Sequence, residues 1–152
     1  ACSAGYRKNS QKEQALGRCV GGFASKINAM VDALGNPLKF ILTSGQRNDI
    51  TQGEALIAGI QDTMVIADKG YDSESIREQI ITKGSRVVIP RRCNALKGND
   101  DLDKGLYRYR HLVENAFARL KQFRALATRF DKLKRNYVSI VAMACAFLWL
   151  PM

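Results

Sequence analysis

The stretch that decides the fold is MVIADKGYDSESIREQIITKGSRVVIP, residues 64–90. It opens with a short apolar run, residues 64–67, which is typical of a strand buried on both faces. Ser73 favours the start of a helix from Glu74 to about Lys83, and Gly84 favours its end. The next strand is expected over residues 86–90, RVVIP. A strand, a helix and a strand in this order predict a βαβ unit with parallel strands.

The segments around this unit predict further strands and helices. Residues 23–32 and 38–43 read as two strands around the turn 33–37, which predicts a hairpin. Helices are expected from Asp49 or Thr51 to about Ile60, from Tyr107 to Thr128, and over the apolar end of the chain from residue 137. That last run is too short to span a membrane, so we expect it to be buried. The whole predicts one α/β domain over 1–152, with a polar N-terminal arm over 1–22.

The charge of the chain indicates the kind of partner it binds. Its 152 residues carry 24 Lys and Arg against 14 Asp and Glu, for a net charge of +10. The segment 86–136 alone holds 14 basic and 5 acidic residues, and we call it the basic segment. A localised basic surface is typical of proteins that bind nucleic acid, although a solvated Lys/Arg-rich surface would explain it too.

The composition also restricts the metal and nucleotide chemistry. The four cysteines, at 2, 19, 93 and 145, form no CxxC pair, and His111 is the single histidine. A metal would therefore be held by carboxylates, which favours Mg²⁺ or Mn²⁺ over Zn²⁺. The glycines at 17, 21 and 22 are not followed by Gly-Lys-Ser/Thr, so they do not form a P-loop.

Two acidic residues stand out as candidates for chemistry. Asp68 follows the predicted strand, at the sheet edge where α/β proteins collect catalytic groups, but Asp-Lys-Gly is also good turn chemistry. At about 100° per residue, Arg110, Glu114 and Lys121 share one helix face, with Tyr107 close to it. The opposite face is apolar, and it is made up of Leu112, Ala116, Leu120, Phe123 and Ala127. An exposed Arg–Glu pair would explain the charged face equally well.

The spacing of these residues resembles a known family. The run Asp68-Lys69-Gly70-Tyr71-Asp72, followed by Tyr107, Arg110, Glu114 and Lys121 at these intervals, is similar to bacterial insertion-sequence DDE transposases. The likeness is to the insertion-sequence-five group, within the superfamily that has the Y-(2)-R-(3)-E-(6)-K signature. Residues 31–37, 111–114 and 128–132 also resemble this group, so the likeness extends over essentially the whole chain.

The resemblance implies a fold and an activity. The fold would be RNase H-like, a mixed sheet flanked by helices, and the activity would be DNA cleavage and strand transfer at insertion-sequence ends, with Mg²⁺ or Mn²⁺. Asp68 and Glu114 would be catalytic residues and metal ligands. DNA contacts are expected from the aromatic and basic residues Tyr107, Arg110, Lys121, Arg91, Arg92, Arg119 and Arg124. The partners would be the terminal inverted repeats and the target DNA, bound by a homodimer in the bacterial cytoplasm at the nucleoid, with no membrane contact.

The chain also departs from the family pattern. The first catalytic Asp of the family lies on a strand that is expected ahead of residue 1, so the sheet is expected to be truncated and the chain alone to be weak or inactive in strand transfer. Asp32 could be proposed as the missing carboxylate, although turn chemistry explains it more simply. A helix-capping turn explains Asp72, and a salt-bridged connector explains Asp131. The alternatives are a non-catalytic DNA-binding remnant of a transposase and another RNase H-like nuclease.

Overall fold

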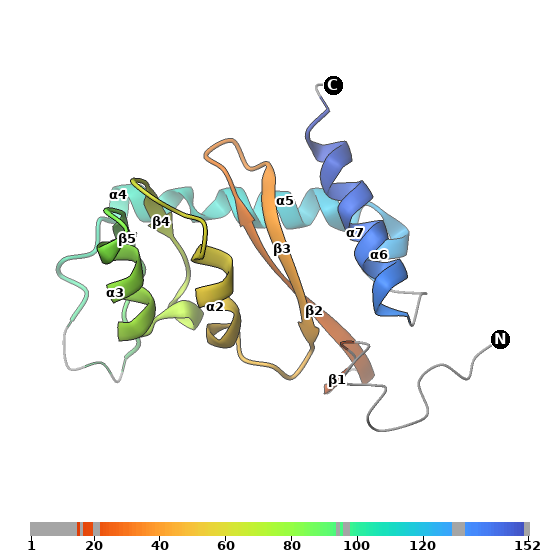
Figure 1. The fold of residues 1–152 in the computed structure, drawn as a ribbon, viewed down its shortest axis with the longest axis horizontal. Helices are drawn as coiled ribbons and strands as arrows, with labels where there is room; N and C mark the ends of the chain where they lie inside the picture. Colours follow the sequence, from red (N-terminus) through yellow and green to blue (C-terminus); the bar gives the residue numbers. More distant parts are fainter. Residues whose placement is uncertain are drawn as a thin grey trace. The chain divides into compact units, whose positions relative to one another are not determined.

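The computed structural model describes residue 15 and residues 17–19, 22–93, 95, 98–128 and 133–150. The chain forms two compact units (Figure 1). The first unit combines residues 1–47 with 113–152, and the second comprises residues 48–112. The expectation of one RNase H-like domain over the whole chain stays a prediction.

An antiparallel sheet of three strands lies in the first unit. Its order is β1 (Gly17–Cys19), β2 (Gly22–Val31) and β3 (Pro37–Ser44). The predicted hairpin is confirmed, because β2 and β3 pair with Ile27 opposite Leu42. The turn between them contains Gly35 at φ 84°, a left-handed conformation that glycine adopts without a steric penalty.

The N-terminal arm expected over 1–22 is only partly described. Residues 1–14, 16, 20 and 21 lie outside the described residues. Residues 17–19, which sequence reasoning assigned to the arm, instead form β1 and pair with β2. That prediction was wrong because the glycines suggested a loop, whereas the backbone groups of this stretch find partners on the neighbouring strand.

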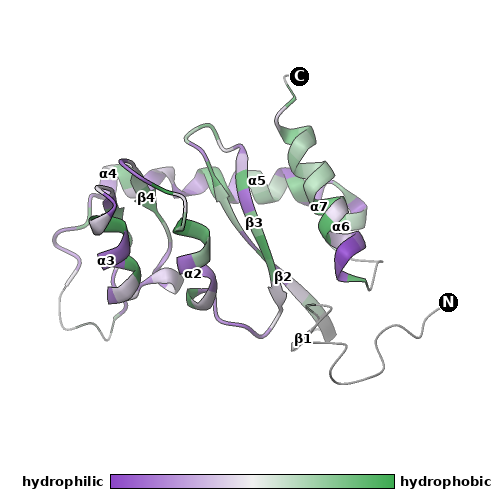
Figure 2. Ribbon diagram, in the orientation of Figure 1, coloured by the Kyte–Doolittle hydropathy of each residue, from purple (hydrophilic) through white to green (hydrophobic). Residues whose placement is uncertain are grey.

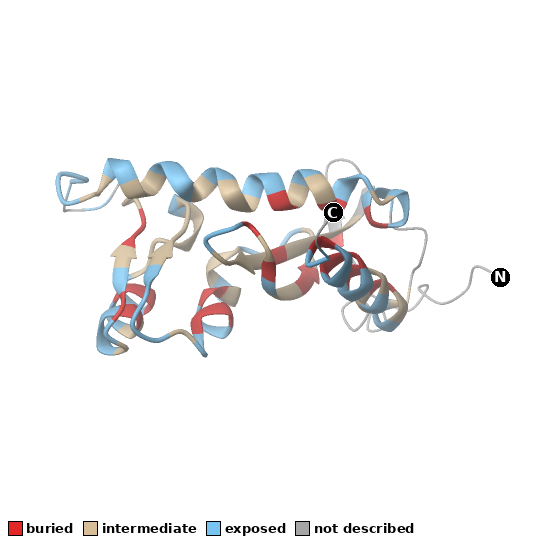
Figure 3. Ribbon diagram, turned by 90° about the horizontal axis from the view of Figure 1, so that it is seen from above, coloured by how far each residue is buried: buried red, intermediate tan, exposed pale blue. Residues whose placement is uncertain are grey.

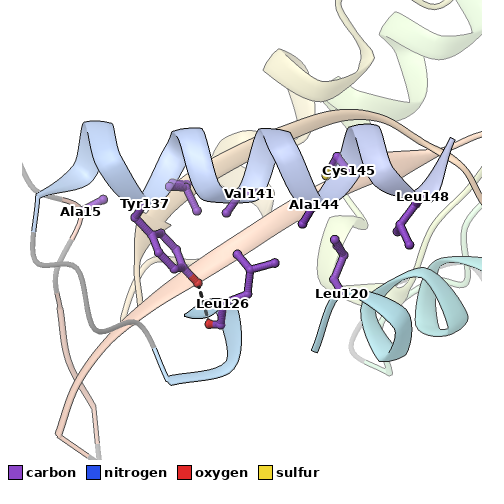
Figure 4. Packing of buried hydrophobic residues seen from close by; sticks show 9 residues of the cluster. Ala15, Leu120, Leu126, Tyr137, Val141, Ala144, Cys145 and Leu148 are labelled. Carbon is purple, nitrogen blue, oxygen red and sulfur yellow. Dashed lines mark hydrogen bonds between the residues drawn. The ribbon is translucent and has the colours of Figure 1, made fainter. Parts of the chain in front are cut away.

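The first unit has its own hydrophobic core. It is formed from β3 and from three helices, α5 (His111–Lys121, of which residues 113–121 belong to this unit), α6 (Arg124–Thr128) and α7 (Lys134–Leu148). Side chains of α7 pack toward Leu120 and Leu126 in Figure 4, and the Tyr137 hydroxyl donates a hydrogen bond to the Leu126 carbonyl, 3.0 Å away. The helix changes from a hydrophilic start to a hydrophobic end (Figure 2). The prediction of a terminal helix that packs on the core is confirmed, but the helix is buried on one face only, because Met143 and Phe147 are exposed.

Two further contacts fix the end of α7 within this unit. The Trp149 indole donates to the Pro37 carbonyl of β3 at 2.8 Å, and Arg119 Nη2 donates to the Leu148 carbonyl at 3.4 Å. Among the described residues, no helix has both the length and the apolar character needed to cross a membrane.

The second unit contains the predicted βαβ arrangement. Strands β4 (Met64–Ile66) and β5 (Arg86–Val88) are parallel and are joined through η1 (Lys69–Tyr71) and α3 (Glu74–Thr82), which Gly84 ends at φ 70°. Helix α2 (Ile50–Ile57) precedes them. The buried positions, red in Figure 3, include the core isoleucines of this unit, Ile57, Ile76, Ile80 and Ile89.

Strand β4 differs from its prediction. It was expected to be buried on both faces, yet Met64 is 52% exposed and Val65 and Ile66 are only half-buried. In the part of the chain that the structure describes, β4 belongs to a two-stranded sheet, which leaves more of its surface uncovered.

The helix expected over 107–128 consists of four shorter pieces. They are α4 (Lys104–Tyr107), η2 (Arg108–Arg110), α5 and α6. Asp103 starts α4, because its Oδ1 accepts a hydrogen bond from the Leu106 amide at 2.9 Å. The break before α6 changes the buried face: Leu126 is buried, whereas Ala127, which was predicted to face the core, is exposed.

Candidate active site

Asp68 lies in the turn that follows β4. Its backbone is extended, and its Oδ1 accepts a hydrogen bond from the Gly70 amide at 2.8 Å. The Asp68 carbonyl accepts a second hydrogen bond from the Tyr71 amide at 3.1 Å. The turn chemistry that the sequence predicted is therefore present. The same bonds hold the carboxylate at the carboxyl end of a parallel strand, where catalytic groups gather in α/β proteins.

A second carboxylate approaches the same turn. A β-carbon built on Gly70 would stand 2.8 Å from Asp68 Oδ1 and 3.5 Å from Asp49 Oδ2. Gly70 thus leaves the space in which the side chains of Asp49 and Asp68 come near each other. Sequence reasoning placed Asp49 at the start of α2, and it does hold that position, but its side chain makes no capping hydrogen bond.

Tyr71 completes this small acidic cluster, which comprises Asp49, Asp68 and Tyr71. Burial is the main cause that raises the pKa of Tyr71, and the negative charges of Asp49 and Asp68 raise it further. The phenol therefore stays protonated at neutral pH beside the two carboxylates. Sequence reasoning missed Asp49 and Tyr71, since Asp49 is distant from Asp68 along the chain and only packing brings them together.

The turn is joined to the segment that follows β5. Arg92 Nε donates to the Lys69 carbonyl at 3.3 Å, and Arg92 Nη2 donates to the Gly70 carbonyl at 3.2 Å. The Arg92 amide donates to Asp72 Oδ2 at 2.8 Å. Arg77 contacts the other oxygen, Asp72 Oδ1, through Nε at 2.9 Å and Nη2 at 2.8 Å.

Asp72 is therefore an ion-pair residue inside the unit. Its side chain is 11% exposed and that of Arg77 is 9% exposed. Burial acts to raise the pKa of Asp72, but the hydrogen bonds from Arg92 and Arg77 and the charges of Arg77 and Arg91 outweigh it, so this pKa lies below its ordinary value. A helix-capping turn was the role that the sequence predicted for Asp72. Asp72 does lie in the turn before α3, but its side chain binds Arg77 and the Arg92 amide instead of capping the helix.

Glu114 lies on α5 in the first unit, whereas Asp68 lies in the second. Glu114 and Lys121 are both exposed, as the charged helix face predicted. A common site for Asp68 and Glu114 stays a prediction.

The structure brings together two of the residues predicted to bind DNA. The guanidinium carbon of Arg110 lies 5.7 Å from the centroid of the Tyr107 ring, which is a cation–π distance. Both side chains are half-buried in the second unit. This contact orients the Arg110 guanidinium over the Tyr107 ring.

The other predicted DNA-binding arginines have different surroundings. Arg91 pairs with Glu74 at 3.1 Å and with Asp101 at 3.6 Å, and its side chain is only 12% exposed. Arg119 reaches the end of α7, as described above. Arg124 is exposed at the start of α6. DNA contact by each of these residues stays a prediction.

Asp32, the alternative third carboxylate, has a turn role in the structure. Its Oδ1 accepts hydrogen bonds from the amides of Leu34 and Asn36, both at 2.8 Å, and its Oδ2 accepts one from the Asn36 side chain at 3.1 Å. Burial acts to raise the pKa of Asp32, and the hydrogen bonds from Asn36, Leu34 and Gly35 lower it below its ordinary value. The simpler explanation offered by the sequence therefore fits. Asp131 lies outside the described residues.

The described part of the chain contains no group of three or more His, Cys, Asp or Glu that could hold a metal ion. The two carboxylates that meet at Gly70 are nevertheless the hard oxygen ligands that Mg²⁺ and Mn²⁺ prefer. The type of ligand atom at this turn therefore suits Mg²⁺ or Mn²⁺.

Comparison with known proteins identifies the family. Residues 4–149 match the family model described as "Transposase DDE domain", and the chain belongs to this family. The chain is 33% identical over 128 residues to a Brucella ovis protein named as a transposase for insertion sequence element IS6501, a match that covers 83% of this chain and 98% of the relative. It is 32% identical over 136 residues to a Burkholderia cepacia protein named as a transposase for insertion sequence element IS402, covering 82% of this chain and 62% of the relative. No solved structure matches the chain.

The resemblance to bacterial insertion-sequence DDE transposases is thus confirmed at the level of the family. Membership of the insertion-sequence-five group stays a prediction.

Proposed function

We propose that this chain is the catalytic part of an insertion-sequence transposase that cleaves and joins DNA strands with a divalent metal ion. The observation that carries the proposal is the position of Asp68. It follows the parallel strand β4, is held by the Gly70 amide, and has a second carboxylate near it, in a chain that belongs to the DDE transposase family. The βαβ unit and the antiparallel hairpin are elements that an RNase H-like fold would contain.

The proposal assigns a role to each acidic residue. Asp68 and Glu114 would be the ligands of Mg²⁺ or Mn²⁺, and Asp49 would add negative charge beside Asp68. When bound, such ions activate the attacking oxygen and stabilise the leaving oxygen of a phosphodiester. The protein's own part is to hold Asp68 by one oxygen, which fixes the direction of its carboxylate.

DNA is the proposed partner, in the form of the terminal inverted repeats and the target. The basic segment supplies the charge for phosphate contacts, with the Tyr107–Arg110 pair in its middle and the exposed Lys121 and Arg124 further along. Affinity of this kind falls steeply as salt rises, because binding releases counterions from DNA. The proposed active species is a dimer on two paired ends.

The test is a nicking assay on a plasmid that carries the terminal repeats of the element, using the full protein that its gene encodes. We expect the wild type to nick the plasmid in the presence of Mg²⁺ or Mn²⁺. With the same metal ions, Asp68→Asn and Glu114→Gln should nick only at the background rate that the wild type shows in EDTA. The matched control is Asp62→Asn, an exposed aspartate of the same unit at φ 46°, a conformation that asparagine adopts readily.

The control variant should nick as the wild type does. If Asp68→Asn and Glu114→Gln nick at the wild-type rate, the catalytic assignment is wrong. If DNA binds but no metal-dependent nicking occurs in any form of the protein, the chain is a non-catalytic DNA-binding protein. Nicking of RNA or branched DNA in preference to the terminal repeats would instead indicate another nuclease.

A further inference from the structure

Arg92 makes contacts that a DNA-binding residue would not need. Its guanidinium donates through two different nitrogens to the carbonyls of Lys69 and Gly70, the two residues directly after Asp68. These acceptors belong to the turn in which the Gly70 and Tyr71 amides donate to Asp68. The side chain of Arg92 is thus hydrogen-bonded to the backbone of the turn that holds the proposed catalytic carboxylate.

The backbone of Arg92 is anchored independently of its side chain. Its amide donates to Asp72 Oδ2, and the other oxygen of Asp72 is bound by Arg77. Arg77 Nη2 also donates to the Ile89 carbonyl at 2.6 Å, which joins the end of the β5 segment to the same ion pair. Because Arg77 and Asp72 are nearly buried, the backbone of Arg92, which is bonded to Asp72, is held in place.

We propose that Arg92 is a positioning residue, which holds the 69–71 turn and thereby sets the direction of the Asp68 carboxylate for metal binding. This inference rests on the proposed function, since it gives Asp68 the role of a metal ligand. The alternative is that Arg92 serves as a cation for DNA phosphate, as its place in the basic segment predicted.

The chemistry of the two side chains separates these roles. A guanidinium is a planar fork that can serve two carbonyls at once, whereas a lysine ammonium is a point charge on a flexible stem. Arg92→Lys keeps the positive charge but loses the planar set of N–H donors, and Arg92→Gln loses both. A contact with a DNA phosphate should be largely kept in Arg92→Lys. The two hydrogen bonds to the backbone of the turn should be lost in both variants.

The experiment measures three properties of the wild type, Arg92→Lys and Arg92→Gln. The first is hydrogen exchange at the amides of Gly70 and Tyr71, which report directly on the turn. The second is Mn²⁺ affinity, followed by calorimetry or by the EPR signal of free Mn²⁺. The third is the dependence of DNA affinity on salt concentration. Arg92 is exposed, so both variants should fold.

We expect amide exchange at Gly70 and Tyr71 to rise by about tenfold in both variants, the scale of losing one or two hydrogen bonds. Mn²⁺ affinity should fall by a similar factor, and the salt slope of DNA binding should not change. Arg124→Gln removes a predicted phosphate contact for comparison, and it should lower the magnitude of the salt slope by about 1 and leave the exchange of Gly70 and Tyr71 unaltered.

Two results would overturn the inference. In the first, amide exchange at Gly70 and Tyr71 equals that of the wild type in both Arg92 variants. At the same time, the salt slope of DNA binding falls in magnitude in Arg92→Gln and keeps its wild-type value in Arg92→Lys. The other is raised exchange with unchanged Mn²⁺ affinity. Failure of the proposed function gives a different result, because Asp68→Asn would then bind Mn²⁺ as well as the wild type does. Amide exchange at Gly70 in the Arg92 variants would still show whether the hydrogen bonds of Arg92 stabilise the turn.

Discussion

At the scale of single residues, Gly70 shows how a missing side chain makes the acidic cluster possible. Any β-carbon there would stand against Asp68 Oδ1 and close to Asp49 Oδ2. Because Gly70 has no side chain, its amide can donate to Asp68 while Asp49 approaches from the start of α2. Two carboxylates near each other repel, and a bound cation would relieve that repulsion.

The Asp72–Arg77 ion pair leads to a prediction about pH. Removing one partner of a buried pair leaves a buried charge, so we expect Arg77→Ala to lower the free energy of unfolding by about 3 kcal/mol at pH 7. The pKa of Asp72 is lowered in the folded protein, so the pair stabilises fully above the unfolded pKa of about 3.9 and loses its effect as the pH falls through the folded value. Urea unfolding at pH 7 and pH 3 should show this difference shrinking.

The matched control for this prediction is Arg86→Ala. Arg86 pairs with Asp103 at 3.0 Å, but the two side chains are 60% and 34% exposed. Such a pair contributes about 1 kcal/mol or less. An effect of Arg77→Ala no larger than that of Arg86→Ala would contradict the structural role of the buried pair.

At the scale of elements, α2 and α3 are held close by a glycine. A β-carbon on Gly53 of α2 would collide with Ile76 Cδ1 of α3 and stand 3.4 Å from Tyr71 Cδ1. This close approach keeps α2, which begins beside Asp49, packed against the βαβ unit.

We therefore expect Gly53→Ala to destabilise the protein by about 1–3 kcal/mol, although alanine is the better helix former. Thermal unfolding followed by circular dichroism measures the change. Gly59→Ala is the control, because a β-carbon there would meet no atom within 4 Å. If both substitutions behave alike, the packing of α2 on α3 does not depend on the glycine.

At the scale of the whole molecule, the net charge of +10 is concentrated in the basic segment. This charge is expected to dominate DNA affinity, since each neutralised phosphate adds to the salt dependence. Lys121 is exposed on α5 and belongs to the same helix as Glu114.

We expect Lys121→Gln to weaken DNA binding for all sequences and to lower the magnitude of the salt slope by about 1. Fluorescence anisotropy at several salt concentrations measures this slope. Arg47→Gln, an exposed arginine outside the basic segment, should leave the slope unchanged. Equal effects of the two substitutions would mean that the charge acts diffusely rather than through the basic segment.

The sequence by itself determined the local elements and the family. The strand patterns at 64–67 and 86–90, the helix between them and the final Gly84 predicted the βαβ unit, because periodicity and turn chemistry act over a few residues. The hairpin and a terminal helix that packs on the core were predicted for the same reason. The intervals from Tyr107 to Lys121, together with Asp68, were enough to indicate DDE transposases.

Only the tertiary structure decided which distant residues meet. It brought Asp49 to Asp68, and it turned Arg92 toward the backbone of the Asp68 turn. It also interrupted the helix expected over 107–128 before α6, and within the described residues it placed β1 to β3 in one sheet and β4 and β5 in another. The physical reason is that such contacts depend on how complete elements pack, and local patterns in the sequence carry no record of that packing.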